Sequence, residues 1–203
     1  MLFVLLSVWF LPESAAAQSA GRDSVVYDLA PAPTSRFEVR TGKAGLLGFA
    51  GHEHLIRARG FSGRIVWYPD QPAASHVAVS VATDSLEVVT PPDTAEIRKV
   101  TATMHEDVLD VAHYPEIILT SRTVERAGDT LRVQAALTMK GQTREIPLTV
   151  RVIIGPDTLR ASTAFVVKQT DFGIRPYRGG PAGTVRVADQ VTFTIEAVAV
   201  RRR

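Results

Sequence analysis

Apolar residues occupy every second position along two neighbouring stretches of the chain, residues 131–139 and 146–154, and this alternation limits the fold more than any other feature of the sequence. Successive side chains of a β-strand point to opposite faces, so a strand with one buried face shows this period of two, whereas a helix repeats every 3.6 residues. Residues 140–143 (KGQT) form a short connection containing glycine. The pattern therefore predicts an antiparallel hairpin.

The same alternation recurs along most of the chain and is interrupted once. Further strands are predicted near residues 36–40, 61–68, 77–81, 117–123, 159–167 and 191–197. Apolar residues after Pro91-Pro92 instead follow helical spacing, which predicts one helix over residues 94–109. About eight strands with one helix and short turns predict an all-β protein, an eight-stranded antiparallel β-barrel. The interior of such a barrel is either filled by side chains or holds one small ligand, and the alternation alone does not distinguish these outcomes.

The first residues predict export from the cell. Residues 2–11 (LFVLLSVWFL) are apolar apart from Ser7 and are followed by Pro12 and by alanines at 15–17. This order is typical of a secretory signal peptide, and a run of about ten residues is too short to cross a bilayer as a helix. We therefore predict a signal peptide over residues 1–17, a flexible lead over 18–33 and one domain over 34–200. The expected location is periplasmic or secreted, with no integral membrane span after cleavage.

Composition excludes several functions. Lys and Arg number 23 against 21 Asp and Glu, and the basic residues are not clustered with aromatic ones, so no nucleic-acid partner is predicted. The chain has no cysteine, which excludes disulfides and thiolate chemistry. The sequence also lacks a nucleophile elbow, a P-loop and a dinucleotide fingerprint. No catalytic residue and no cofactor are predicted, and a homodimer remains open.

Two closely spaced histidines, His52 and His54, stand out in the glycine-rich stretch 42–63. In an extended chain they share a face with Ile56, opposite Arg57 and its neighbours, which predicts that both imidazoles point inward. Three interpretations remain open. The histidines bond to backbone carbonyls or water, they contact a ligand head group, or they bind a metal ion with a third ligand from elsewhere in the chain. Candidates for that third ligand are His105, Glu106 and His113.

Other polar residues are interpreted as structural. The cluster of His105, Glu106 and Asp107 with Asp110 and His113 falls at the end of the predicted helix, where solvated polar residues ordinarily collect. Asp171 precedes a stretch rich in glycine and proline, residues 176–183, which is predicted to be a mobile loop. We expect the Asp171 carboxylate to accept hydrogen bonds from backbone amides and to fix the turn there.

Four segments of the chain resemble the motifs of the YceI-like family, in order and in spacing. They are residues 107–117 (DVLDVAHYPEI), 137–143 (LTMKGQT), 168–174 (KQTDFGI) and 189–196 (DQVTFTIE). The resemblance covers roughly residues 26–198 and departs from the family pattern most at 48–54 (GFAGHEH). It implies an extended, lipocalin-like eight-stranded barrel, mostly in secreted or periplasmic proteins. It also implies a polyisoprenoid or an isoprenoid quinone held in the lumen.

These observations predict a non-catalytic protein that binds or transports an amphiphilic apolar ligand, an isoprenoid lipid or quinone. The alternatives are a metal-binding module or metal-dependent enzyme centred on His52 and His54, and a filled barrel that serves as an interaction module. Head-group contact is assigned to His52 and His54. The predicted apolar lining of the lumen is Phe37, Val39, Leu46, Phe49, Ile56, Phe61, Ile65, Trp67, Val79, Leu137, Leu148, Phe165 and Phe193.

Overall fold

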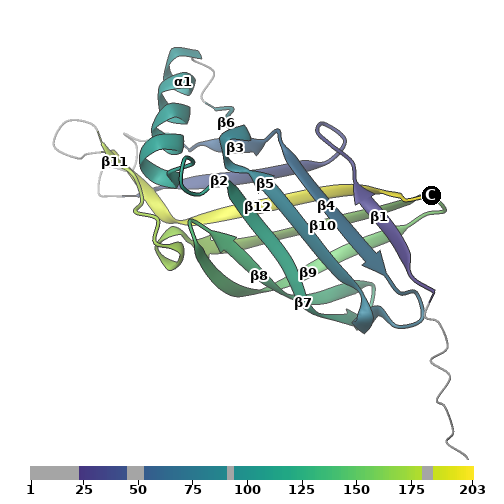
Figure 1. Cartoon of the computed structure of the whole chain (residues 1–203). Coiled ribbons are helices and arrows are strands. Elements are labelled where there is room, and N and C mark those ends of the chain that lie inside the picture. Colours follow the sequence, from purple (N-terminus) through teal and green to yellow (C-terminus); the bar gives the residue numbers. More distant parts are fainter. Residues whose placement is uncertain (1–22, 45–52, 91–93, 180–184) are drawn as a thin grey trace, which may run out of the picture.

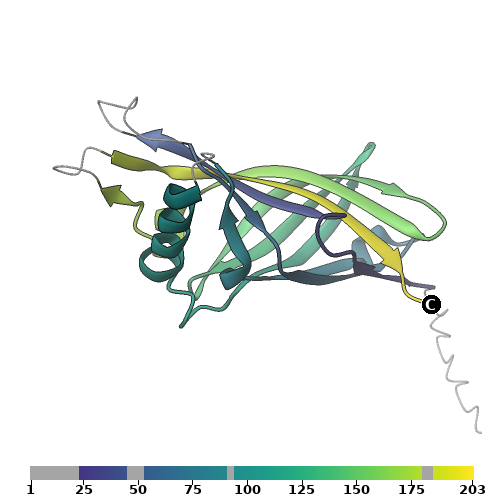
Figure 2. The same ribbon diagram turned by 90° about the horizontal axis from the view of Figure 1, so that it is seen from above.

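Strands that are neighbours in the sheet run antiparallel throughout the computed structural model, which describes residues 23–44, 53–90, 94–179 and 185–203. Figures 1 and 2 show an elongated barrel with α1 and β11 at one end and the C-terminus at the other. We call these the helix end and the far end. The strands are β1 (Val25–Leu29), β2 (Arg36–Ala44), β3 (Leu55–Ala58), β4 (Phe61–Trp67), β5 (His76–Ala82), β6 (Leu86–Val88), β7 (Glu116–Ala127), β8 (Thr130–Met139), β9 (Gln142–Ile154), β10 (Thr158–Lys168), β11 (Arg178–Gly179) and β12 (Val185–Arg201).

Eight strands form a closed ring in the order β1-β4-β5-β7-β8-β9-β10-β12, which confirms the predicted antiparallel barrel. The ring closes where β1 pairs with the last residues of β12, Tyr27 opposite Arg201 and Leu29 opposite Ala199. Upstream of these residues, the same edge of β12 pairs with β2, which carries β3 and then β6. The 17-residue β12 thus belongs to both the ring and this three-strand extension.

Specific side chains explain the breaks that separate β1 from β2 and β3 from β4. Ser35 is fully buried between β1 and β2, where its hydroxyl donates to the Val198 carbonyl and accepts from the Val198 N–H, replacing a backbone partner for β12. At the other break, the Ser85 hydroxyl approaches the Gly60 carbonyl at 3.0 Å. A Cβ at Gly60 would lie 3.0 Å from the Ser85 Cβ, so this close approach favours glycine there.

The helix lies at the helix end, beside the short strand β6 (Figures 1 and 2). It consists of α1 (Thr94–Thr103) followed by a π-helical turn, η4 (Met104–Leu109), and ends at Asp110 in the left-handed conformation. The sequence predicts one helix over the same residues but not the change to π geometry. Two side chains hold η4 in place. The Lys140 ammonium donates to the Val108 carbonyl at 2.9 Å, and His105 Nε2 lies 2.8 Å from the Leu86 carbonyl.

Two boundaries differ from the prediction. The lead predicted over residues 18–33 contains β1, because Val25, Tyr27 and Leu29 alternate as in a strand although the run is only five residues long. Tyr27 is buried and joins the core with Trp67. In the predicted loop over residues 176–183, Arg178 and Gly179 form the short strand β11, which pairs with β12. The predicted signal peptide lies outside the described residues. Within the described ranges, no helix combines the length and apolar character needed to cross a membrane.

Candidate functional site

Two apolar cavities lie end to end inside the barrel. Each contains about 120 Å³ in which the centre of a water molecule can move, far more than the one or two waters that a tightly packed core admits. Phe37 and Ile195 line both cavities and face each other across β2 and β12. The interior of this barrel is therefore hollow in two places, with these two side chains between them.

The first cavity, called the helix-end chamber, lies beneath η4. Met104, Val108 and Leu109 of η4 cover it, and β2, β3 and β12 supply much of the remaining wall. Its lining consists of Phe37, Glu38, Val39, Thr41, Ile56, Ala58, Val81, Leu86, Met104, Val108, Leu109, Ile117, Met139, Gln169, Ile174, Val191, Phe193 and Ile195.

The second cavity, called the far chamber, extends to the opposite end of the barrel, where Trp67 and Leu159 are buried. Two small residues, Ala161 and Ala197, face each other across β10 and β12 and leave much of its space free. Its lining consists of Leu29, Phe37, Gly63, Arg64, Ile65, Trp67, Ser75, His76, Val77, Val79, Leu119, Val124, Leu131, Val133, Ala135, Leu148, Val150, Val152, Leu159, Ala161, Thr163, Ile195 and Ala197.

Aromatic rings are concentrated near the junction of the two chambers. Phe37 contacts Phe61 with ring centroids 4.6 Å apart, and Phe165 stacks on Phe193 at 5.0 Å. Aromatic pairs of this kind contribute more stabilisation than the burial of their surface alone provides. They therefore stabilise the barrel wall at the junction of the two chambers.

The structure brings most of the predicted lining residues to the lumen. Phe37, Val39, Ile56 and Phe193 line the helix-end chamber, and Phe37, Ile65, Trp67, Val79 and Leu148 line the far chamber. The other described members of the predicted set belong to the surrounding core, and they are Phe61, Leu137 and Phe165. Leu46, Phe49 and His52 lie outside the described residues.

Sequence reasoning did not assign the η4 residues to the site. The spacing of Met104 and Val108 identifies an apolar helix face, but it does not show that this face covers a cavity rather than a solid core. Thr41 and Gln169 were also missed, because a single polar residue within an alternating strand gives no signal of its own. Thr41 lies two positions after Val39 on the same strand, so the alternation of a strand could have placed it on the inner face with Val39.

Thr41 and Gln169 are buried polar residues of the helix-end chamber, with 8% and 9% of their surfaces exposed. The Thr41 hydroxyl accepts a hydrogen bond from the backbone N–H of His54 at 3.1 Å. The Gln169 amide nitrogen donates to the carbonyl of Ala188 at 2.8 Å. Each group therefore uses only part of its hydrogen-bonding capacity within the described part of the protein.

An irregular stretch of β12 holds Gln169 in position. The pairing of β12 with β2 shifts between Val187 and Val191, and Ala188 and Asp189 lie in this interval. The Asp189 carboxylate accepts hydrogen bonds from the Thr170 N–H at 2.9 Å and the Thr170 hydroxyl at 2.7 Å. Burial raises the pKa of Asp189, but these hydrogen bonds outweigh that effect and hold the pKa below its ordinary value. Asp189 thus makes the turn-fixing contacts that the sequence assigned to Asp171.

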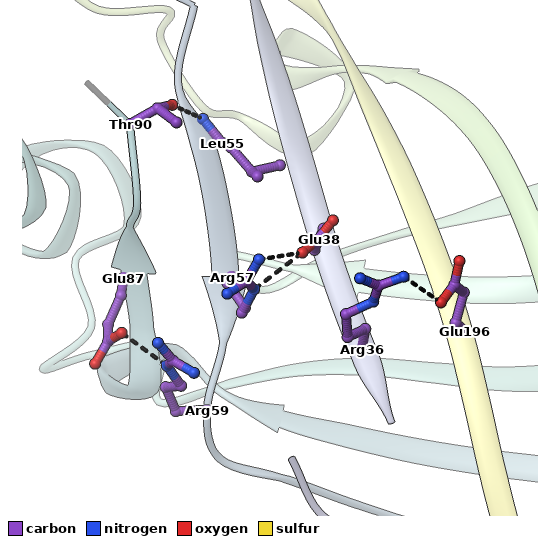
Figure 3. A network of polar contacts seen from close by, with 8 residues as sticks. All are labelled: Arg36, Glu38, Leu55, Arg57, Arg59, Glu87, Thr90 and Glu196. Atoms are coloured by element: carbon purple, nitrogen blue, oxygen red, sulfur yellow. Dashed lines mark hydrogen bonds and ion pairs between the residues drawn. The ribbon is translucent and has the colours of Figure 1, made fainter. Parts of the chain in front are cut away.

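Charged residues on the outer surface hold the extension together. Figure 3 shows a row of ion pairs across β12, β2, β3 and β6. They are Arg36 with Glu196, Arg57 with Glu38 and Arg59 with Glu87. Glu38 also borders the helix-end chamber, yet its carboxylate is engaged by Arg57 at 2.7 Å. The charges of this region are therefore paired on the outside and are not presented to the lumen.

His54 is half-buried, and its ring does not line either chamber. Its Nδ1 lies 2.9 Å from the backbone carbonyl of Thr90, and because a carbonyl only accepts, Nδ1 carries the proton. The Thr90 hydroxyl accepts from the Leu55 N–H at 2.8 Å (Figure 3), so this segment is held by local backbone contacts. Among the described residues, no three His, Asp or Glu side chains lie close enough to hold a metal ion together.

The polar cluster near the helix end makes local contacts. His113 is exposed and its Nδ1 lies 2.7 Å from the Asp110 carboxylate, whereas His105 reaches the Leu86 carbonyl. Glu106 and Asp107 are exposed. These groups do not converge on a common point in either chamber.

A closed antiparallel barrel with an apolar lumen defines the lipocalin-like class of folds. Comparison with known sequences identifies the family, because the YceI-like domain matches residues 27–199. The chain belongs to the YceI-like family, as the motif order indicates.

Known relatives and solved structures agree with this assignment. Protein YceI of Escherichia coli O157:H7 and Protein YceI of Shigella sonnei are each 30% identical over 93 residues, and the chain spans about half the length (46%) of these curated relatives. The crystal structure of Burkholderia cenocepacia BcnA superposes with a TM-score of 0.65 at 18% identity, covering 81% of this chain and 95% of that one. A YceI protein of Campylobacter jejuni gives a TM-score of 0.56 at 17% identity, with 73% and 85% covered. At these identities the structural matches establish the fold alone.

Proposed function

We propose that this protein binds an elongated, amphiphilic apolar ligand, an isoprenoid lipid or an isoprenoid quinone, along the two chambers of its barrel. The observation that carries the proposal is the end-to-end arrangement of two apolar cavities that share Phe37 and Ile195. A flexible unbranched or isoprenoid chain suits this shape, whereas a rigid globular ligand does not. The function is binding or transport without catalysis.

The chemistry of the lining supports an apolar occupant. Moving apolar surface out of water contributes about 25 cal/mol per Å², or about 0.8 kcal/mol per CH₂ group, so a chain of many carbons binds without polar contacts. Empty space of this size leaves the lining atoms without partners on one side, and a ligand restores those dispersion contacts. Filling the chambers therefore favours the bound state.

The described lining offers little support for catalysis. Glu38, the acidic residue of the helix-end chamber, is paired with Arg57 on the outer face, and His76, which borders the far chamber, is exposed. A general acid or base must lie within hydrogen-bonding distance of the reacting group, and the Glu38 carboxylate is instead hydrogen-bonded to Arg57. Binding and release of a ligand need no such group.

We place this activity in the periplasm or outside the cell. The apolar run at 2–11 and the alanines at 15–17 support export through a cleaved signal peptide. A carrier with an enclosed apolar lumen suits an aqueous compartment beside a membrane, because it shields a lipid from water during transfer.

The direct test is extraction of the protein purified from its native envelope with organic solvent, followed by mass spectrometry of the extract. We expect one dominant class of isoprenoid lipid or quinone in near-stoichiometric amount. A barrel that is repeatedly empty, and that takes up no lipid from vesicles containing isoprenoid quinone, would exclude the proposed function.

A further inference from the structure

We propose that Thr41 and Gln169 form a binding subsite for an uncharged, oxygen-bearing head group, an alcohol or a quinol, at the helix end of the lumen. The inference rests on the proposed function, because it concerns the polar part of the ligand whose apolar chain occupies the barrel. It specifies where that head group is bound and which chemistry is excluded.

The hydrogen-bonding capacity left on the two side chains is complementary. Thr41 Oγ1 accepts from the His54 N–H, and the hydroxyl proton of Thr41 has no acceptor among the described residues. Gln169 donates from its amide nitrogen to Ala188, and its Oε1 has no hydrogen-bond partner among the residues that the structure describes. The chamber therefore presents one donor and one acceptor, both on residues more than nine-tenths buried.

The strand register fixes how far apart these groups lie. Val191 on β12 pairs with Thr41 on β2 and with Val167 on β10, which places all three residues in one row across three strands. Gln169 follows two positions after Val167 and also lines the chamber. Neighbouring strands are about 4.8 Å apart, so Thr41 and Gln169 are separated by on the order of 10 Å. One small ring with oxygen atoms on opposite sides can bridge that gap with two hydrogen bonds.

The charges of the chamber exclude an anionic head group. Its described lining includes no Lys, Arg or His, and its acidic member, Glu38, is engaged by Arg57. A phosphate brought into this site would lose its hydration without gaining a cation, which is strongly unfavourable. A neutral hydroxyl group has less hydration to lose, and it can either accept from Thr41 or donate to Gln169, whereas a quinol has one oxygen for each of the two residues. The subsite is therefore selective for neutral ligands over their phosphorylated forms.

The experiment compares three probes with the same C20 isoprenoid tail: geranylgeraniol, geranylgeranyl monophosphate and the hydrocarbon without a head group. Binding to the delipidated mature protein is followed by the fluorescence of Trp67, which lines the far chamber and is the one tryptophan left after the proposed cleavage removes Trp9. The variants are Thr41→Val and Gln169→Leu. Thr41→Ser keeps the hydroxyl, and Thr194→Val removes a hydroxyl from an exposed position of β12 that lines neither chamber, as a matched control.

We expect geranylgeraniol to bind at least tenfold more tightly than its monophosphate and about fivefold more tightly than the hydrocarbon, the effect of one net hydrogen bond. Because the single hydroxyl of geranylgeraniol reaches only one of the two residues, at least one of the variants Thr41→Val and Gln169→Leu should bring the alcohol-to-hydrocarbon ratio close to one. Thr41→Ser and Thr194→Val should preserve the preference for the alcohol. Hydrocarbon affinity serves as the internal control for a folded barrel, because the tail contacts remain in every variant.

The outcomes separate the two proposals. Tight binding of all probes with no preference for the alcohol, or a preference for the monophosphate, would overturn the subsite while leaving the lumen function intact. The subsite is also overturned if both variants retain the alcohol preference. If none of the three probes binds the unmodified barrel, the proposed function fails and the subsite fails with it.

Discussion

Arg57 donates two hydrogen bonds to one carboxylate oxygen of Glu38, from Nε at 2.9 Å and from Nη2 at 2.7 Å. The two residues face each other across β2 and β3, and both are more enclosed than the members of the neighbouring pairs Arg36–Glu196 and Arg59–Glu87. Strand β3 has only four residues, so few backbone hydrogen bonds hold it to β2. This ion pair is therefore a major fixing point for the extension that carries Ile56 and Ala58 to the helix-end chamber.

Glu38→Gln should lower the free energy of unfolding by about 1–2 kcal/mol, because a hydrogen-bonded charge pair at a partly enclosed site loses its charged acceptor. Urea denaturation monitored by circular dichroism measures the change. Glu87→Gln is the matched control, since the exposed pair with Arg59 should contribute about 0.5 kcal/mol or less. Equal losses in the two variants would show that enclosure of the Glu38 pair adds nothing.

Filling the far chamber should remove its ligand without unfolding the barrel. Ala161→Leu combined with Ala197→Leu adds apolar volume where two small residues leave free space. We expect the free energy of unfolding to stay the same or to rise by about 1–2 kcal/mol, because the added carbons are buried in an existing cavity. The amount of lipid extracted should fall at least tenfold.

Ala164→Leu is the control for this change, because Ala164 lies on the same strand but is exposed. It should leave the extracted lipid unchanged. A double variant that retains a full-length ligand at the original level would place the ligand outside the far chamber.

Asp189→Asn should reduce the sensitivity of the fold to acid. The folded-state pKa of Asp189 is lowered, so its stabilising contribution is present above the unfolded pKa of about 3.9 and is lost as the pH falls through the lower folded value. The unmodified protein should therefore lose more unfolding free energy than the variant between pH 5 and pH 2.5. Thr170→Val removes one of the two hydrogen bonds and should produce part of the same change. Parallel stability curves for the unmodified protein and Asp189→Asn would contradict this account.

Elemental analysis of untagged protein should find no stoichiometric zinc, iron or copper. The His54 imidazole donates from Nδ1 to the Thr90 carbonyl and offers a metal only its Nε2, and no group of three metal-binding side chains surrounds it among the described residues. Stable metal sites in proteins ordinarily use three or four protein ligands. One equivalent of metal that disappears in His54→Ala would support the metal-binding alternative.

The sequence predicts the barrel well because its signal is local and repeated. Alternation along β8 and β9 follows directly from the burial of one face, and the hairpin between them needs positive φ at Lys140 and Gly141. The same alternation places residues such as Val39 and Trp67 on the inner face, where they line the cavities, although other inward residues such as Leu137 pack in the surrounding core.

Other features depend on contacts between distant segments and could not be predicted from local pattern. The π-helical turn η4 is held by Lys140, which is 32 residues from its acceptor Val108. The orientation of Gln169 depends on an irregularity in β12 near Ala188. Whether the interior is hollow depends on the summed volume of the side chains from all strands. The alternation of apolar residues shows which side chains face inward but not how much of the interior they fill.

Strand β12 makes hydrogen bonds with β10 along one edge and with β2 and β1 along the other. It is also the last strand of the ring to be synthesised, so the preceding seven strands of the ring form at most an open sheet until β12 is available. Open sheet edges favour association with other chains. During biogenesis the barrel therefore closes only when β12 pairs with β10 and β1, which is late in synthesis. A ligand can be enclosed in the lumen only after β12 has been translated.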